Sequence, residues 1–251
     1  MLLRTQTPWI DSVLRHGMTS HFQPIVDVRS GDTVAHEALA RGWHQELDLN
    51  GGQILDAARA HGRMDEFDQR ARENAFAVAS RSIIGTGGLF VNVFPTAFVE
   101  VQKDMARLGE EIDSYGLRRE IITLELLESG DATDVSFLIE LAQAARRESI
   151  KIALDDVGSG NNTLAYVDKI RPDYVKFDRH LCPVIPSEAD VSLLMGVVDY
   201  AHSKGAVVVA EGIETEAQYR TAMDCGVDMA QGYYIGRPAP APDLRVPNQA
   251  S

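Results

Sequence analysis

The stretch HFQPIVDVRSGDTVAHEALAR (residues 21–41) contains two apolar, β-branched runs separated by a very short polar segment. The runs HFQPIVDV (21–28) and DTVAHEALAR (32–41) are typical of β-strands. The segment between them includes Gly31, suits a hairpin turn and is too short for a crossover helix. We therefore expect the first strand to run antiparallel to the second.

Beyond this hairpin, short apolar runs alternate with segments of helical spacing. Further strands are predicted at LFVNVF (89–94), IITLELLE (121–128), IKIALDD (150–156), YVKFD (174–178), AVVVAEG (206–212) and DMAQGYY (228–234). Helices are predicted at 51–62, 64–83, 96–112, 133–149, 163–170, 188–205 and 215–226. Such alternation indicates a parallel, buried sheet, and eight strands over about 250 residues match a (β/α)₈ barrel. The predicted fold class is α/β, a modified TIM barrel with an antiparallel first strand.

The chain is expected to form one domain, because no linker, low-complexity tract or long charge run interrupts the alternation. We expect the barrel domain to cover residues 20–239. A short helical lead-in is expected over 1–19 and an irregular, proline-rich tail over 240–251.

Composition restricts the classes of partner. The formal net charge of −13 opposes binding to nucleic-acid polymers and to anionic membrane surfaces. The cysteines, Cys182 and Cys225, lack the spacing of a zinc site or a disulfide framework. The N-terminus has no sustained apolar leader, and no run approaches the roughly 20 apolar residues of a membrane span. We therefore expect a cytoplasmic protein without membrane insertion.

Polar residues recur at the ends of the predicted strands, which in a barrel of this class face one common mouth. They are Glu37, Arg41, Asn92, Glu125, Glu128, Asp155, Asp156, Lys176, Glu211 and Gln231. The adjacent acids Asp155 and Asp156, taken alone, fit a solvated strand end as well as a functional site. Several carboxylates in one concave site, however, repel one another unless cations lie among them. Oxygen ligands without Cys or His suit Mg²⁺ or Mn²⁺ better than zinc.

This set of residues favours metal-assisted hydrolysis of a phosphoester. Two ions roughly 3.5–4 Å apart can clamp a phosphodiester and lower the pKa of a bridging water. Lys176 can hold that water or stabilise developing charge, and the planar guanidinium of Arg41 can bind a phosphate. Another metal-dependent barrel enzyme, such as one that stabilises an enolate, stays open at this point.

Seven ordered segments resemble the EAL domains of bacteria, named after a Glu-Ala-Leu motif that stands here at Glu37-Ala38-Leu39. The segments are HFQPIVDVRSGDTVAHEALAR, VNVFP, LELLES, IALDDVGSG, YVKFD, VVAEGIET and QGYYIGRP, over roughly residues 20–238. The resemblance implies a modified TIM barrel that hydrolyses cyclic di-GMP to linear pGpG with two Mg²⁺ or Mn²⁺ ions, in bacterial second-messenger signalling.

The resemblance also implies a role for each polar position. It implies metal ligation by Glu37, Asn92, Glu125, Asp155, Asp156 and Glu211. It implies catalytic roles for Glu37, Lys176 and Gln231, the last two positioning a water, and substrate contacts for Gln23 and Arg41. Glu128 would anchor the loop after the fifth strand, which in the family couples dimerisation to activity, so a homodimer is expected. Glu214 is expected to cap the following helix or to lie behind the site.

Departures from the family pattern fall outside the implied metal ligands. The loop usually written DDFGTG reads DDVGSG, with Val157 and Ser159 at the changed positions. Leu127 stands where Thr is usual, and Ala40 is the fourth residue of the EALLR-like motif. These changes bear on dimer-coupled regulation rather than on chemistry. The alternative to an active enzyme is a catalytically impaired EAL domain that acts as a cyclic di-GMP receptor or a protein-interaction module.

Overall fold

The first two long strands form the predicted hairpin, β1 (Met18–Asp27) and β2 (Thr33–His44), in antiparallel register. In this register Gln23 lies opposite Glu37. Asp27 stabilises the turn, because its Oδ1 accepts two backbone N–H groups of the following residues at 2.9 and 2.8 Å. The computed structural model describes residues 9–44, 46–82, 87–126, 135–155, 157, 163–177 and 187–241.

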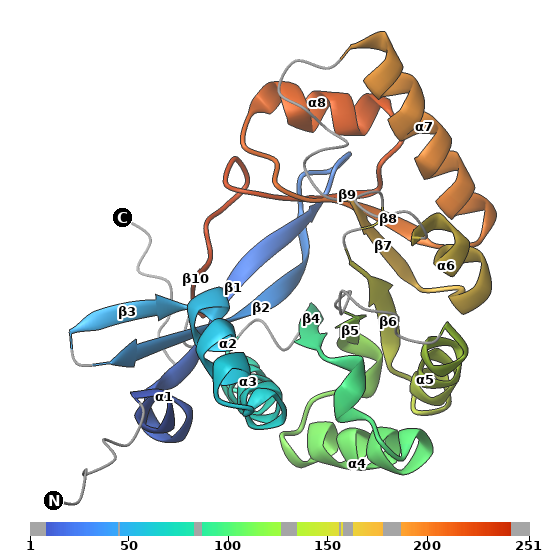
Figure 1. Ribbon diagram of the computed structural model, residues 1–251. Coiled ribbons are helices and arrows are strands. Elements are labelled where there is room, and N and C mark those ends of the chain that lie inside the picture. The colour runs from blue at the N-terminus through green and yellow to red at the C-terminus, as the bar shows by residue number, and fades with distance from the viewer. Residues whose placement is uncertain are drawn as a thin grey trace, which may run out of the picture.

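The strands close into a barrel (Figure 1). Its further members are β4 (Gly88–Val93), β5 (Ile122–Leu126), β6 (Lys151–Leu154), β7 (Tyr174–Phe177), β8 (Val207–Ala210) and β9 (Met229–Gln231). Hydrogen bonding follows the order β1, β9, β8, β7, β6, β5, β4, β2, and the β1–β2 pairing closes the ring. Every neighbouring pair is parallel except the two that involve β1. The predicted barrel with an antiparallel first strand is confirmed.

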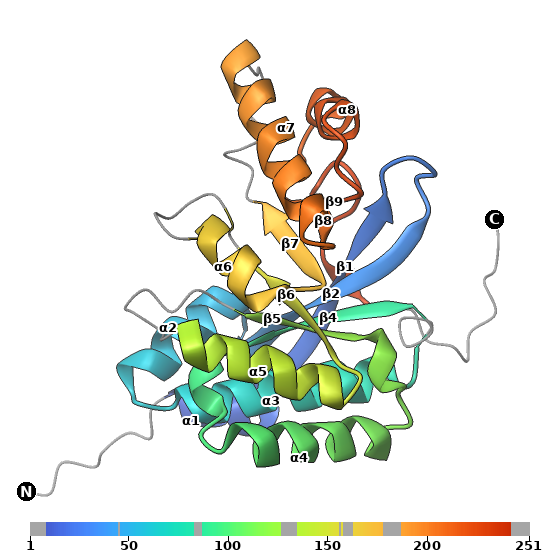
Figure 2. The ribbon, with the colours of Figure 1, turned by 90° about the vertical axis from the view of Figure 1, so that its right-hand side faces the viewer.

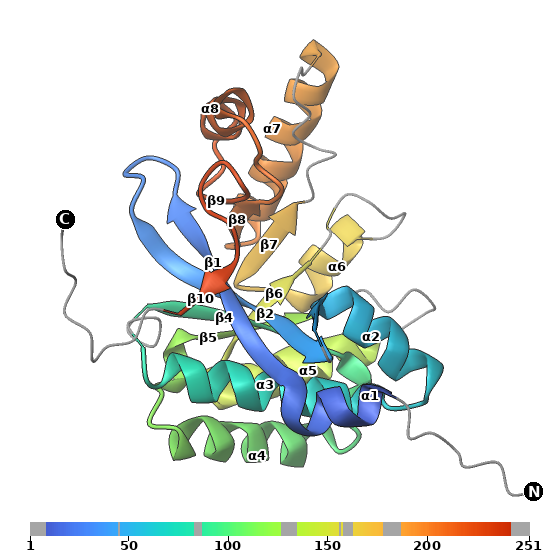
Figure 3. The ribbon, with the colours of Figure 1, turned by 90° about the vertical axis from the view of Figure 1, so that its left-hand side faces the viewer.

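Helices pack around the outside of this barrel, with α3, α4 and α5 along one side and α7 and α8 along another (Figures 2 and 3). The helices are α1 (Trp9–Ser12), α2 (Gly51–Ala60), α3 (Met64–Ala79), α4 (Val101–Ser114), α5 (Val135–Arg147), α6 (Thr163–Ile170), α7 (Glu188–Ser203) and α8 (Glu216–Asp224). A π-helical turn (Val13–Gly17) and 3₁₀ turns (Pro95–Ala97 and Arg119–Ile121) complete the helical elements of the described residues. None of the described helices is both long and apolar enough to cross a bilayer.

One helix begins later than its sequence predicts. The prediction starts at residue 96, whereas α4 starts at Val101. Pro95 begins a 3₁₀ turn, and Phe98 then leaves helical geometry, with a ψ of 78°, and lies buried in the core. The start of the prediction was therefore wrong, because burial of Phe98 redirects the chain before α4.

Two short strands that the sequence did not predict extend the sheet beside the carboxyl ends of the barrel strands. β3 (Leu47–Asn50) pairs with the end of β2, and β10 (Ala239–Pro240) pairs with the start of β1. The helical lead-in was predicted over residues 1–19. Its described part consists of α1 and the π-helical turn, and it ends at Gly17, because β1 begins at Met18. Residues 1–8 and 242–251 lie outside the described residues, so the predicted domain limits stay predictions. Cys225 is buried and free, and Cys182 also lies outside the described residues.

An apolar layer fills the barrel interior directly below the polar residues of the mouth. It consists of Ile25, Ala35, Phe90, Ala153 and Val209, with Tyr174 and Met229 packed against it. Each of these residues lies two positions from a polar site candidate on the same strand or directly after its end, and side chains two apart on extended backbone share a face. The pairs are Ile25 and Gln23, Ala35 and Glu37, Phe90 and Asn92, Ala153 and Asp155, Tyr174 and Lys176, Val209 and Glu211, Met229 and Gln231. The fold therefore places a polar layer on an apolar floor.

Candidate active site

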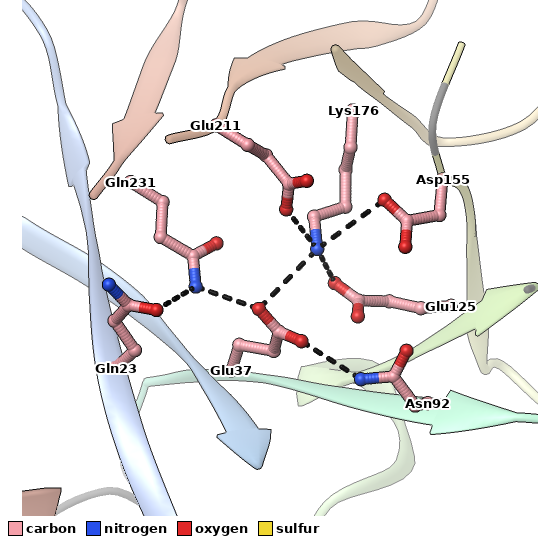
Figure 4. Close-up of polar contacts among 8 residues, drawn as sticks. All are labelled: Gln23, Glu37, Asn92, Glu125, Asp155, Lys176, Glu211 and Gln231. Carbon is pink, nitrogen blue, oxygen red and sulfur yellow. Dashed lines mark hydrogen bonds and ion pairs between the residues drawn. The ribbon is translucent and has the colours of Figure 1, made fainter. Parts of the chain in front are cut away.

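Lys176 occupies the centre of the polar layer (Figure 4). Its Nζ lies 2.5 Å from Glu125 Oε1 and 2.5 Å from Glu211 Oε1. Glu37 Oε2 is 3.5 Å away and Asp155 Oδ1 is 3.9 Å away. The lysine is only 1% exposed, and a buried charge is costly unless it is paired. Five strands or strand ends thus deliver one ammonium and four carboxylates to a single point.

This cluster carries more negative than positive charge. Four carboxylates and one ammonium have a net charge of −3 when all are ionised. Burial, joined by the charge of Glu37, raises the pKa of Glu125 well above its ordinary value. Burial also raises the pKa of Glu211 to about 8, although Lys176 opposes the rise. Without a further cation, burial therefore favours the protonated form of both carboxyl groups relative to a carboxyl group in water.

Glu37 and Lys176 show the opposite balance between burial and partners. Burial would raise the pKa of Glu37, but the ammonium of Lys176 and two amide hydrogen bonds outweigh it, so this pKa is lowered. Burial would lower the pKa of Lys176, but the surrounding carboxylates raise it well above its ordinary value. The surrounding carboxylates therefore favour the charged form of Lys176.

A chain of side-chain amides holds Glu37 from the other side. Asn92 Nδ2 donates to Glu37 Oε1 at 2.9 Å, and Gln231 Nε2 donates to Glu37 Oε2 at 2.7 Å. Gln231 Nε2 also lies 3.1 Å from Gln23 Oε1, and Gln23 Nε2 donates to the carbonyl oxygen of Gly236 at 3.0 Å. Both oxygens of Glu37 therefore accept a hydrogen bond while the carboxylate stays ionised.

The donor chemistry fits hard divalent cations. Oxygen atoms of carboxylates and amides dominate the site, and cations would offset its excess negative charge. Glu125 Oε2 and Gln231 Oε1 are buried without a hydrogen-bond partner among the described residues. Among the described residues, no group of three or more His, Cys, Asp or Glu side chains is arranged so that it could hold a metal ion. Glu125 and Glu211 instead both contact the ammonium of Lys176.

An open pocket of about 380 Å³ gives access to this layer. It is lined by Gln23, Glu37, Leu39, Asp155, Lys176, Glu211, Gly212, Glu214, Gln231, Gly232 and Tyr233. Sequence reasoning missed Leu39, Gly212, Gly232 and Tyr233, although each lies next to or within two residues of a predicted site residue. That spacing was the available signal, because loops at the end of a barrel strand line the same mouth.

Glu214 was excluded from the predicted site, yet it lines the pocket. The residue that caps α8 is Thr215, whose side chain accepts the N–H of Gln218, so the capping role expected of Glu214 is wrong. The backbone N–H groups of Glu214 and Thr215 both donate to Gln218 Oε1, at 2.9 and 3.1 Å. These bonds fix the loop that follows Glu211.

The remaining predicted site residues lie at the edge of the site or outside the described part of the chain. Arg41 lies four residues after Glu37 on β2, and its Nη1 donates to the carbonyl oxygen of Ala40 at 2.8 Å. Burial lowers the pKa of Arg41 from its ordinary value. Asp156 and Glu128 lie outside the described residues, so their predicted roles stay predictions.

Comparisons with known proteins agree with this architecture. A family model described as the EAL domain matches residues 10–238. Cyclic di-GMP phosphodiesterase NbdA of Pseudomonas aeruginosa is 29% identical over 252 residues, and the match covers 92% of this chain and 32% of NbdA. The chain thus spans about a third of the length of that relative.

Solved structures agree as well. An EAL domain protein from Listeria monocytogenes superposes with a TM-score of 0.82 over 96% of both chains, at 23% identity, which shows the fold alone. Klebsiella pneumoniae BlrP1, in a manganese and cyclic di-GMP complex, superposes with a TM-score of 0.80 at 25% identity, covering 90% of this chain and 57% of BlrP1.

Proposed function

The chain belongs to the EAL domain family, and from this premise we propose that it is a metal-dependent phosphodiesterase that hydrolyses cyclic di-GMP to linear pGpG. The observation that carries the proposal is the polar layer itself. Four carboxylates surround Lys176 with an excess of negative charge, at the floor of an open pocket. A receptor would not need such a costly arrangement, because binding the dinucleotide requires no buried acidic cluster.

The proposed metal ligands are Glu37, Asn92, Glu125, Asp155 and Glu211, together with Asp156, which lies outside the described residues. Two Mg²⁺ or Mn²⁺ ions bound there would supply positive charge at the phosphate and lower the pKa of the attacking water. The NbdA and BlrP1 comparisons support the choice of substrate, and the manganese in the BlrP1 complex supports a divalent cation.

The protein's own residues provide position and charge. Lys176 is a fixed cation next to four carboxylates and would stabilise negative charge that develops during attack of the water. The orphaned oxygen of Gln231 would accept a hydrogen bond from a water in the pocket. Arg41, on the same strand face as Glu37, would bind a phosphate oxygen. Water adds to phosphorus, the ribose 3′ oxygen leaves with a proton, and the linear product keeps its 5′ phosphate.

We extend the proposal to the setting of the reaction. A homodimer in the bacterial cytoplasm, with Glu128 anchoring the loop after β6, is the setting that the family resemblance favours. The substrate is a small dinucleotide, since the net charge of −13 opposes a nucleic-acid polymer as partner.

Product analysis tests the proposed function. The protein is incubated with cyclic di-GMP and Mg²⁺ or Mn²⁺, beside the variants Glu37→Gln and Asp48→Asn and a chelator control. Asp48 is an exposed acid on β3, so Asp48→Asn makes the same chemical change away from the carboxylate cluster. We expect pGpG from the parent and from Asp48→Asn, and a loss of at least about 100-fold with Glu37→Gln or chelator. Binding of the dinucleotide without any product would instead identify a receptor.

A further inference from the structure

We propose that Gln23 is a positioning residue that fixes the side-chain amide of Gln231, a role distinct from the substrate contact expected from the sequence. The inference deepens the proposed function, on which it rests for the role of Gln231 toward the attacking water. It starts from the buried hydrogen-bond chain that runs from Gly236 through Gln23 and Gln231 to Glu37 (Figure 4).

The two ends of this chain determine the direction of every hydrogen bond in it. The carbonyl oxygen of Gly236 can only accept, so Gln23 must present its NH₂ group there, at 3.0 Å. The oxygen of Gln23 then faces Gln231 and accepts from its Nε2 at 3.1 Å. At the other end, Oε2 of Glu37 accepts from the same nitrogen at 2.7 Å. Only one amide orientation satisfies all three contacts.

This orientation leaves the oxygen of Gln231 turned away from both partners. Gln231 is 3% exposed, and its Oε1 is buried without a hydrogen-bond partner among the described residues. An orphaned buried acceptor beside a pocket is suited to one donor, which a bound water can supply. If the amide turned over, its oxygen would face the oxygens of both Glu37 and Gln23, and the three acceptors would repel one another. Gln23 therefore adds a second acceptor that disfavours the reversed orientation of the Gln231 amide, beside that of Glu37.

The backbone holds the first member of this chain firmly in place. Gly236 donates its N–H to the carbonyl oxygen of Gly232 at 3.0 Å. A Cβ atom at Gly236 would lie 2.7 Å from Cγ of Pro24, so only glycine lets this segment approach β1 closely enough to meet Gln23. Gln231 is held by the N–H of Ile213, which donates to its carbonyl oxygen at 3.0 Å. The acceptor that orients Gln23 is thus part of a rigid turn.

Two hydrogen bonds fix the side chain of Gln23 itself. The side chain is 8% exposed, its nitrogen is bound to Gly236 and its oxygen to Gln231. Rotation of Gln23 away from these partners would leave buried groups unpaired, at a cost of about 1–3 kcal/mol each.

The two roles predict different kinetics for Gln23→Met, which keeps the length of the side chain and removes both polar atoms. Loss of positioning lowers kcat about tenfold or more and leaves the KM for cyclic di-GMP within about twofold. Loss of a substrate contact raises KM instead. A double-mutant cycle sharpens the test: in a Gln231→Met background, Gln23→Met should have almost no further effect on kcat. Gln102→Met, on the exposed face of α4, is the control for the substitution itself.

A spectroscopic measurement separates this inference from the proposed activity. Side-chain amide NMR of the resting protein should show slowly exchanging Gln231 NH₂ protons in the parent and fast exchange in Gln23→Met. That result in a protein without activity would retain the positioning inference and reject the proposed function. Unchanged Gln231 exchange in Gln23→Met, or a raised KM with kcat preserved, would overturn the inference while leaving the phosphodiesterase proposal intact.

Discussion

Replacing Lys176 with methionine should destabilise the protein more strongly when divalent cations are absent than when they are bound. The substitution keeps an unbranched chain of the length of the aliphatic part of lysine but removes the ammonium that lies 2.5 Å from both Glu125 and Glu211. The four carboxylates are then left without their shared cation. Breaking a buried ion pair by removing one partner typically costs about 3–5 kcal/mol.

The protonation equilibrium gives an independent value for this cost. The variant can relieve the excess charge by binding one more proton in the folded state. For a carboxyl group with an ordinary pKa of about 4.3, this costs roughly 3.7 kcal/mol at pH 7 and roughly 1.6 kcal/mol at pH 5.5. The proton is bound only in the folded state, so the loss of stability grows as the pH rises above the ordinary carboxyl pKa. Both routes indicate a loss of about 3–4 kcal/mol at pH 7.

Urea unfolding, at pH 7 and pH 5.5 and with either chelator or excess Mn²⁺, measures this loss. In chelator the deficit should be large at pH 7 and about half as large at pH 5.5, and in Mn²⁺ it should shrink at both, because the cation takes over the charge compensation. Lys204→Met is the matched control, since Lys204 forms a more exposed pair with Asp168 at 2.5 Å and should cost under about 1 kcal/mol. Equal losses for Lys176→Met in chelator and Mn²⁺, or no loss in chelator, would refute the electrostatic reasoning.

Two further predictions concern a structural acid and metal binding. Asp68→Ala should lower the free energy of unfolding by about 3 kcal/mol, because the N–H of Phe94 and the guanidinium of Arg72 lose a buried acceptor; urea unfolding beside the exposed control Asp65→Ala measures this. Since burial raises the pKa of Glu211 to about 8, a cation must displace its proton below that pH. Mn²⁺ affinity should rise at least about tenfold per pH unit below pH 8, since Glu125 also has a raised pKa and adds to the dependence, and calorimetry in buffers of different ionisation enthalpy should show proton release; a flat profile would contradict the assignment.

The sequence predicted β4 to β8 well because each is a short, largely apolar run bounded by polar or turn residues. Such runs are buried on both faces of a parallel sheet and need no context to be recognised. β3 escaped prediction because it has only four residues, three of which are exposed. β10 has only two residues, which is too short for any pattern. Strands without a buried face depend on tertiary pairing, which sequence periodicity does not report.

The site could be predicted only as far as the two-residue period of the strands extends. That period places Glu37, Asn92 and Glu211 above the apolar floor, as expected from residues that end apolar runs. Contacts between distant strands could not be read in this way. Gln23 and Gly236 are 213 positions apart, and neither residue type indicates their hydrogen bond. Nor does the sequence around Lys176 reveal that its partners come from four other strands or strand ends.

The antiparallel direction of β1 also determines where the chain enters the barrel. In a barrel with eight parallel strands, the chain enters the first strand at the end opposite the mouth. Here α1 and the π-helical turn meet β1 beside the mouth, and Ile10, Val13 and Leu14 pack there with Phe94, two residues after Asn92. Only five positions separate Met18 from Gln23. Residues 9–17 are therefore joined to Gln23 through the first residues of β1 alone, so we expect a displacement of this segment to reach the polar layer without crossing the other strands.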